Sequence, residues 1–212
     1  MLKISAVVED IVYENPLLFD AIGEDIVNFR QVAKNILLQV EARTLKTVSV
    51  ETITVSLSRL AGKIQKKKNW LKIVAAGLQD FSTKTPITQF VCTKSETNLQ
   101  ALSTIKTVNE EFFSITVGKK EINILASPYY RGQIVRTLHV LHELPAMTLL
   151  TIHFSEKLVT IPGLIYFISS LMYRGNIPII EIVSTYTELN LLVETKNLQK
   201  ATQIITKQMR FE

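Results

Sequence analysis

The composition of this chain is typical of a folded, water-soluble protein that carries a modest positive charge. It has 212 residues, of which 47% are hydrophobic and 20% are charged, and a formal net charge of +5. Its single cysteine, Cys92, excludes an intrachain disulfide and a metal site built from several cysteines. No uncharged stretch reaches the ~20 residues of a membrane span, and acids interrupt the N-terminal stretch where a signal peptide would be apolar. We therefore expect a cytoplasmic protein of two or three small domains with no membrane partner.

Charge is unevenly distributed in the first third of the chain. Residues 1–27 contain one base and six acids, whereas residues 28–68 contain nine bases and two acids, a local net charge of +7. A basic segment of this kind favours an anionic partner such as DNA. The alternative is a solvated helix face followed by a lysine-rich linker.

Residues 1–68 are predicted to form a helical domain. A first helix is expected over Ile4–Glu14, ended by Asn15-Pro16, and a second begins at Asn28 with apolar residues on one face at helical spacing. After a break at Thr44–Val48, Ser49 can cap a further helix that runs into the lysine cluster at 66–68.

The helix after Ser49 carries a polar and basic stripe. Two helices separated by a short break, the second with such a stripe, are typical of a helix-turn-helix motif that contacts DNA. The candidate nucleic-acid contacts are Thr52, Ser56, Arg59, Lys63, Lys66 and Lys67. Two extended runs at residues 70–82, on either side of Gly77, are predicted to form the wing of a winged-helix-like domain. The alternative is that the stripe is only the solvated side of a small helical domain.

From residue 86 onward, strand and helix patterns alternate. The order strand–helix–strand–strand–helix is found at residues 87–140 and again at 147–207. The second copy has a predicted helix over Thr160–Tyr173, with Pro162 near its start and Gly175 just past its end. We therefore predict an α+β fold with two ferredoxin-like βαββαβ modules and antiparallel sheets, at residues 86–143 and 146–212. Such modules pair with each other or across a homodimer, because one module cannot cover all its edges.

The second copy resembles the ACT-domain family. Residues 152–176, IHFSEKLVTIPGLIYFISSLMYRGN, are similar to the first strand, loop and helix of an aspartokinase-type ACT domain, in which a Pro-Gly pair follows the first strand. Residues 179–205, IIEIVSTYTELNLLVETKNLQKATQII, resemble the remainder of that module. The layout of the whole chain is also similar to an uncharacterised, mostly archaeal group of prokaryotic proteins that joins a helix-turn-helix-like region to ACT-like repeats.

The resemblance implies a ligand site at the loop between the first strand and the first helix of the second module. The matching residues are Thr160, Ile161, Pro162, Gly163 and Leu164, together with Asn176 and Ile177 from the facing turn. Gly163 would allow a ligand to approach the backbone, and the helix start would offer N–H groups to a carboxylate. The first module has Lys94-Ser95-Glu96 at the equivalent loop, so its pocket is predicted to be degenerate. The alternative is that Pro162-Gly163 only forms a tight turn.

No residue pattern in the sequence predicts catalysis. Gly-rich phosphate loops and nucleophile motifs are missing, and His139 and His142 lack an obvious third metal ligand. We therefore expect a non-enzymatic protein without metal or cofactor. Our hypothesis is a transcriptional regulator that senses a small molecule such as an amino acid and acts as a homodimer. The alternatives are a dimerisation or interaction protein and a separate regulatory subunit of an amino-acid biosynthetic enzyme.

Overall fold

The computed structural model divides into two compact units, Met1–Lys72 and Ile73–Glu212. It describes residues 2–67 and 70–209, without the side chains of residues 65–72. Each unit has hydrophobic core clusters of its own.

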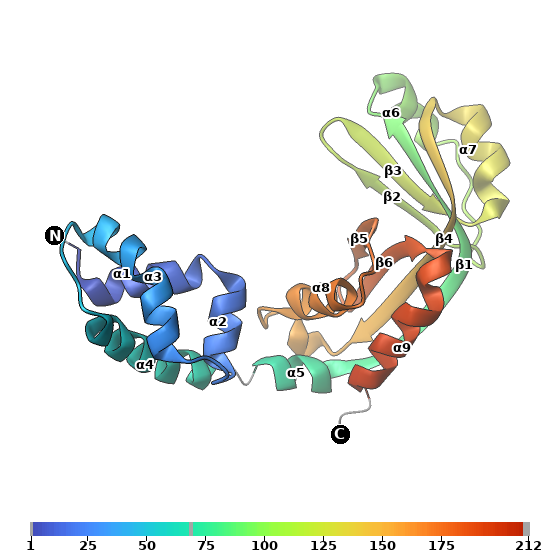
Figure 1. Ribbon diagram of the computed structural model, residues 1–212. Helices are drawn as coiled ribbons and strands as arrows, with labels where there is room; N and C mark the ends of the chain where they lie inside the picture. The colour runs from blue at the N-terminus through green and yellow to red at the C-terminus, as the bar shows by residue number, and fades with distance from the viewer. Residues whose placement is uncertain (1, 68–69, 210–212) are drawn as a thin grey trace. The chain divides into compact units, whose positions relative to one another are not determined.

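The N-terminal unit is helical (Figure 1). Its helices are α1 (Ile4–Tyr13), α2 (Pro16–Gly23), α3 (Phe29–Thr44) and α4 (Val50–Lys67), and α5 (Trp70–Gly77) follows across the boundary between the units. Asparagine caps start two of them, because the Asn15 and Asn28 side chains accept hydrogen bonds from the backbone N–H groups of Leu18 and Gln31 at 3.1 Å. The sequence Asn15-Pro16 therefore both ends α1 and begins α2.

The core of the N-terminal unit is aliphatic and draws on all four of its helices. Val8, Ile22, Ala33 and Leu57 are fully buried within it. Ion pairs join the helices at the surface, most closely where Arg43 donates two hydrogen bonds to Glu14 at 2.7 and 2.9 Å. That pairing lowers the pKa of the Glu14 carboxyl, chiefly through the hydrogen bonds from Arg43.

The prediction of a wing at residues 70–82 is wrong. Residues Trp70–Gly77 form the helix α5, and Leu78–Ser82 begin the long strand β1 of the other unit. The run WLKIVAAG contains several good helix formers, and Gly77 ends this helix instead of turning a hairpin.

The C-terminal unit is a six-stranded antiparallel sheet with helices (Figure 1). The strands, in sheet order, are β2 (Phe113–Val117), β3 (Glu121–Ala126), β1 (Leu78–Thr93), β4 (Val140–Phe154), β6 (Glu188–Glu194) and β5 (Glu181–Ser184). The helices are α6 (Glu96–Leu102), α7 (Arg131–Thr137), α8 (Leu164–Arg174) and α9 (Leu198–Met209). The predicted α+β fold with an antiparallel sheet is confirmed, and the division into two modules stays a prediction.

The two central strands, β1 and β4, run through both halves of the sheet. Their register is interrupted between Lys84 and Ile87, opposite Met147–Leu149. Figure 1 shows both strands bending there. The register shifts again between Ile87 and Gln89, opposite Met147 and Leu144. Pro86 lies in the first of these irregular stretches and Pro145 in the second, where the missing N–H donor of proline is tolerated. The predicted module boundary at 143–146 therefore falls inside a continuous strand.

The C-terminal unit buries hydrophobic residues in three places. Under α6 and α7, residues such as Phe90, Ile124 and Tyr130 form one core, and α8 and α9 bury Ile168 and Ile205. A third cluster lies where the two halves of the sheet meet, and its buried members are Ile87, Leu125, Met147, Leu149 and Leu192.

A partly buried hydrogen bond accompanies this third cluster. The Gln89 amide on β1 donates to the Glu181 carboxylate on β5 at 2.6 Å. Burial raises the pKa of Glu181, and the hydrogen bond from Gln89 partly opposes that rise. Residues 92 positions apart in the sequence are thus held together across the bend.

Because the two units have separate hydrophobic cores, a core substitution in one unit is expected to destabilise that unit and not the other. Leu57→Ala on α4 is expected to lower the free energy of unfolding of the N-terminal unit by about 2–5 kcal/mol, because Leu57 is fully buried in that core alone. Leu150→Ala on β4, equally buried, is the matched variant for the C-terminal unit. Peptide-resolved hydrogen exchange over a denaturant series measures both, and equal loss of protection in the two units from either variant would contradict the division.

Candidate functional site

The loop between β4 and α8 is fixed at its base by close packing. After Phe154, a 3₁₀ turn at Glu156–Leu158 buries the Leu158 side chain. A Cβ on Gly77 would lie 2.7 Å from Leu158, so only glycine allows this side chain to sit there. The Ser155 N–H donates to the Gly77 carbonyl at 2.9 Å. The loop is thus tied to the start of β1.

Gly163 sets the entry into α8. Its φ of 109° and ψ of −5° place it in a conformation that L side chains rarely adopt. It contributes no side chain to cap the helix, whose first turn has N–H groups without partners inside the helix. Pro162-Gly163 thus forms a sharp turn from the loop into α8, called the Gly163 corner below, where no side chain at Gly163 covers the backbone.

The β5–β6 turn lies beside this corner. The Thr185 N–H donates to the Glu188 carbonyl at 3.0 Å, which closes the turn. The Phe154 N–H donates to the Thr187 carbonyl at 3.0 Å, which ties the turn to the end of β4. Two segments distant in the sequence are therefore held next to each other.

The loop, the start of α8 and the β5–β6 turn line an open hollow of about 360 Å³. Its lining comes from Phe154, Leu158, Val159, Ile161, Gly163, Leu164, Ile165, Tyr166, Ser184, Thr185, Tyr186 and Leu189. No Asp, Glu, Lys, Arg or His is among these lining residues. An apolar hollow with a few hydroxyl and backbone groups is a common form of small-molecule site.

The structure brings together part of the predicted ligand site. Ile161, Gly163 and Leu164 line the hollow, whereas Thr160 and Pro162 lie in the same loop outside its lining. The predicted helix Thr160–Tyr173 begins later, at Leu164, because Gly163 is not helical.

Asn176 and Ile177 lie at the other end of α8. Ile177 is buried and its N–H donates to the Met172 carbonyl at 2.9 Å, while Asn176 adopts a left-handed φ of 50°. An 11-residue helix is about 16 Å long, so these residues do not meet the Gly163 corner of the same chain.

The β5–β6 turn was not predicted to be part of the site. Ser184, Thr185 and Tyr186 line the hollow, and Tyr186 is 66% exposed. An exposed aromatic at the tip of a hairpin is the signal that could have indicated them.

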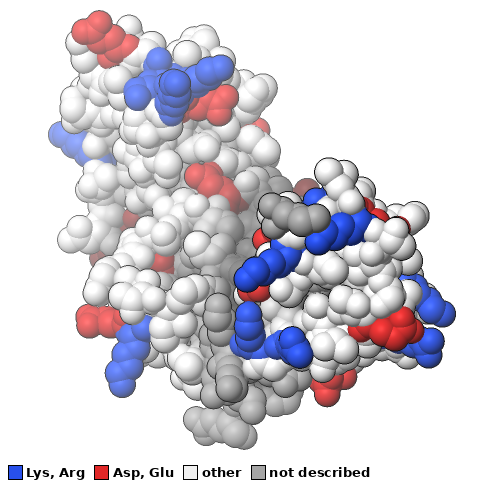
Figure 2. All heavy atoms as spheres, turned by 90° about the vertical axis from the view of Figure 1, so that its left-hand side faces the viewer, with Lys and Arg blue, Asp and Glu red and all other residues white. Residues whose placement is uncertain are grey.

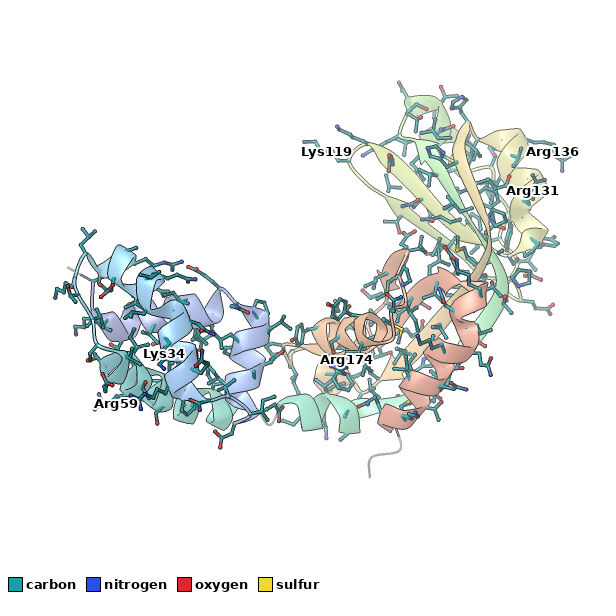
Figure 3. The ribbon with its side chains drawn as sticks, viewed as in Figure 1. Lys34, Arg59, Lys119, Arg131, Arg136 and Arg174 are labelled. Atoms are coloured by element: carbon teal, nitrogen blue, oxygen red, sulfur yellow. The ribbon has the colours of Figure 1, made fainter. Side chains whose placement is uncertain are left out.

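The predicted nucleic-acid contacts lie on α4 (Figure 3). Thr52, Arg59 and Lys63 are exposed and Ser56 is partly buried, with its hydroxyl donating to the Thr52 carbonyl. Lys63 forms an ion pair with Glu9 of α1 at 3.6 Å, and the glutamate offsets the positive charge that Lys63 would present to DNA. The side chains of Lys66 and Lys67 lie outside the described residues.

The surface of the N-terminal unit is mixed in charge. This unit faces the viewer in Figure 2, where basic side chains are interspersed with acidic ones. A DNA-binding face on this unit would have few cations available for phosphate contacts. Arg30, Arg43 and Lys63 pair with glutamates, whereas Arg59 has no ion-pair partner among the described residues.

The other reactive side chains do not converge. Cys92 is buried on β1, where burial raises the pKa of its thiol. His142 lies on β4. Within the described residues, no three His, Cys, Asp or Glu side chains come together where a metal ion could be held.

Comparison with known proteins identifies the fold of the larger unit. No protein-family model matches the sequence, and no curated protein matches it. Among solved structures, the regulatory subunits of aspartate kinase from Thermus thermophilus (ligand-free form) and Thermus flavus are similar. Their sequence identities to this chain are 9% and 8%, and both TM-scores are 0.51. The matches cover 64% and 63% of this chain, respectively, and 99% of each subunit.

A larger protein shows the same likeness. The aspartate kinase of Clostridium acetobutylicum is 15% identical, with a TM-score of 0.50, over 63% of this chain and 35% of the enzyme. This chain therefore spans about a third of that enzyme but nearly all of the two regulatory subunits. An ACT-like fold is confirmed by these neighbours, and at these identities the likeness concerns the fold alone.

None of the described helices combines the length and the apolar character needed to cross a bilayer.

Gly163→Ala is expected to lower the free energy of unfolding of the C-terminal unit by about 1–3 kcal/mol, because alanine is strained at a φ of 109°. Gly132→Ala in α7 is the control, since its Cβ would make only an ordinary contact, 3.5 Å from the Arg136 side chain. Chemical denaturation measures both, and similar free energies for the two variants would show that the Gly163 corner is not strained.

Proposed function

We propose that this protein is a regulator whose C-terminal unit binds a small apolar amino acid in the hollow at the Gly163 corner. The observation that carries the proposal is an open apolar hollow of about 360 Å³, lined in part by a left-handed glycine, on an ACT-like fold. The fold neighbours are regulatory subunits of aspartate kinase, which supports regulation as the general role.

The lining of the hollow narrows the class of effector. A charged side chain would be desolvated there without a countercharge, which costs free energy. The α-carboxylate can instead face the N–H groups at the start of α8, where the helix dipole is positive. The hydroxyl groups of Ser184 and Thr185, together with backbone carbonyls, offer acceptors to the α-ammonium. Leucine, isoleucine, valine, methionine and phenylalanine are therefore the best candidates.

The second part of the proposal concerns the N-terminal unit. The α3–α4 pair, joined by residues 45–49 and bearing Arg59 on α4, supports a helix-turn-helix that contacts DNA in a homodimer. A ligand that binds one arrangement of the dimer better than another would shift the spacing of two such units. On this view the protein is a non-enzymatic transcriptional regulator.

A second candidate function is a regulatory subunit that acts on a separate enzyme chain. The observation in its favour is that this chain covers 99% of the length of the Thermus regulatory subunits. The helical unit would then bind a protein, and the apolar hollow would serve the same sensing role.

The effector proposal is tested by calorimetry and by thermal stability with single amino acids. At a hundred times its Kd, an apolar amino acid is expected to stabilise the protein by about 2.7 kcal/mol, whereas lysine, arginine, aspartate and glutamate leave it unchanged. Ser184→Trp, which fills the hollow from β5, is expected to abolish the response. Thr116→Trp, also exposed on an edge strand of the same sheet, is the matched control. A flat response to all amino acids, or a response retained in Ser184→Trp, would contradict the proposal.

DNA contact is tested on α4. Arg59→Ala is expected to weaken DNA binding and to reduce the slope of log affinity against log salt by about 0.9, the loss of one phosphate contact. Glu9→Gln is expected to strengthen binding, because it releases Lys63 from its ion pair. Lys34→Ala on the neighbouring α3 is the control. Unchanged binding in Arg59→Ala would exclude this face, and binding of a protein but not of DNA would favour the second candidate.

A further inference from the structure

The helices α8 and α9 carry an unbalanced positive charge. Together they contain Arg174, Lys200 and Lys207 and no aspartate or glutamate. None of these three side chains has an ion-pair partner among the described residues, whereas Arg43, Arg131 and Lys196 all pair with a glutamate. Within residues 2–67 and 70–209, no ion pair therefore neutralises the charge of these two helices.

All three cations line one hollow. It measures about 290 Å³ and is bounded by Leu171, Arg174, Gly175, Lys200, Ile204, Lys207 and Gln208. Arg174 comes from the last turn of α8 (Figure 3), and the two lysines come from α9. Lys200 and Lys207 are seven residues apart, so they share one helix face about 10 Å apart along the axis.

Gly175 brings the two helices close enough to form this hollow. A Cβ there would lie 2.5 Å from the Ile204 side chain and 3.2 Å from that of Ile177. The end of α8 therefore rests directly against α9, and Arg174 is held beside the two lysines. Helix packing at Gly175 therefore sets the position of the Arg174 backbone relative to α9.

Helix dipoles do not explain the cluster. Arg174 and Lys207 occupy last turns, where a cation is favourable. Lys200 is the third residue of α9, at the positive end of the helix, where a cation is unfavourable. Lys200 also adds to the repulsion among three like charges around one hollow, which a bound anion would relieve.

We propose that this basic hollow binds a small anion carrying two or more phosphate groups in a row, such as a nucleoside polyphosphate. The spread of the lysines suits successive phosphates better than one phosphate, and the arginine can engage phosphate oxygens in a bidentate manner. Leu171 and Ile204 give the hollow apolar surface for the remainder of the ligand. Its volume is near the lower end for small-molecule sites, and duplex DNA would need more phosphate contacts than three cations provide.

The test uses calorimetry on the full chain with inorganic tripolyphosphate, ATP and a DNA duplex as separate probes. Tripolyphosphate is expected to bind one to one, and Lys200→Ala with Lys207→Ala is expected to weaken it at least tenfold. Tighter binding of ATP than of tripolyphosphate would identify a nucleotide as the source of the phosphates. Lys119→Ala with Lys120→Ala, which removes the same charge at the β2–β3 turn, is expected to leave binding unchanged.

Three results would overturn the proposal. These are no binding of tripolyphosphate or ATP, an equal loss of binding in the Lys119 and Lys120 control, and binding of duplex DNA alone. Because both double variants change exposed lysines, equal melting temperatures will show that the fold is retained. The site is separate from the apolar hollow, so its failure leaves the effector proposal standing, and Ser184→Trp is expected to bind tripolyphosphate normally.

Discussion

The pairing of β1 with β4 is the constraint on which the C-terminal unit depends. These strands, of 16 and 15 residues, are neighbours along most of their length and belong to both halves of the sheet. One half adds β3 and β2 to β1, and the other adds β6 and β5 to β4. The irregular register near Pro86 and Pro145 lets the pair bend, so that the two halves can bury the cluster around Leu149 and Leu192.

The same pair positions the apolar hollow and connects it to the rest of the chain. β4 ends at Phe154, where the loop begins, and β1 begins next to Gly77, on which Leu158 packs. A ligand that shifts the loop would act first on the Ser155–Gly77 hydrogen bond and the Leu158 contact. Gly77 is the last residue of α5, the helix that follows the N-terminal unit.

The sequence predicted local elements well and long-range pairing poorly. Helical periodicity located α3 and α4, and the Pro162-Gly163 pair located the corner that lines the hollow. The predicted module limits at residues 86 and 143–146 fall inside β1 and β4, because strand register is not visible in one sequence. Pro86 and Pro145 are compatible with these strands only where the ladder is irregular. The contribution of Thr185 and Tyr186 was missed for a similar reason: it depends on which strands become neighbours. The spacing of hydrophobic residues indicates which face of a single helix or strand is buried. It does not indicate which two elements lie side by side, and a site formed by two elements can be predicted only when that is known.

The two hollows at opposite ends of α8 differ in the chemistry they accept. One has no charged residue in its lining, and the other has three cations and no acid. Both touch the same 11-residue helix, whose N-terminal end is fixed by Gly163 and whose C-terminal end is packed on α9 through Gly175. Because a packed helix moves as a body more readily than it bends, a ligand at one end would change the affinity at the other if it shifts α8 along its axis. Thermodynamic linkage makes such an effect reciprocal. The helix α8 is therefore the element through which two chemically different signals would be combined.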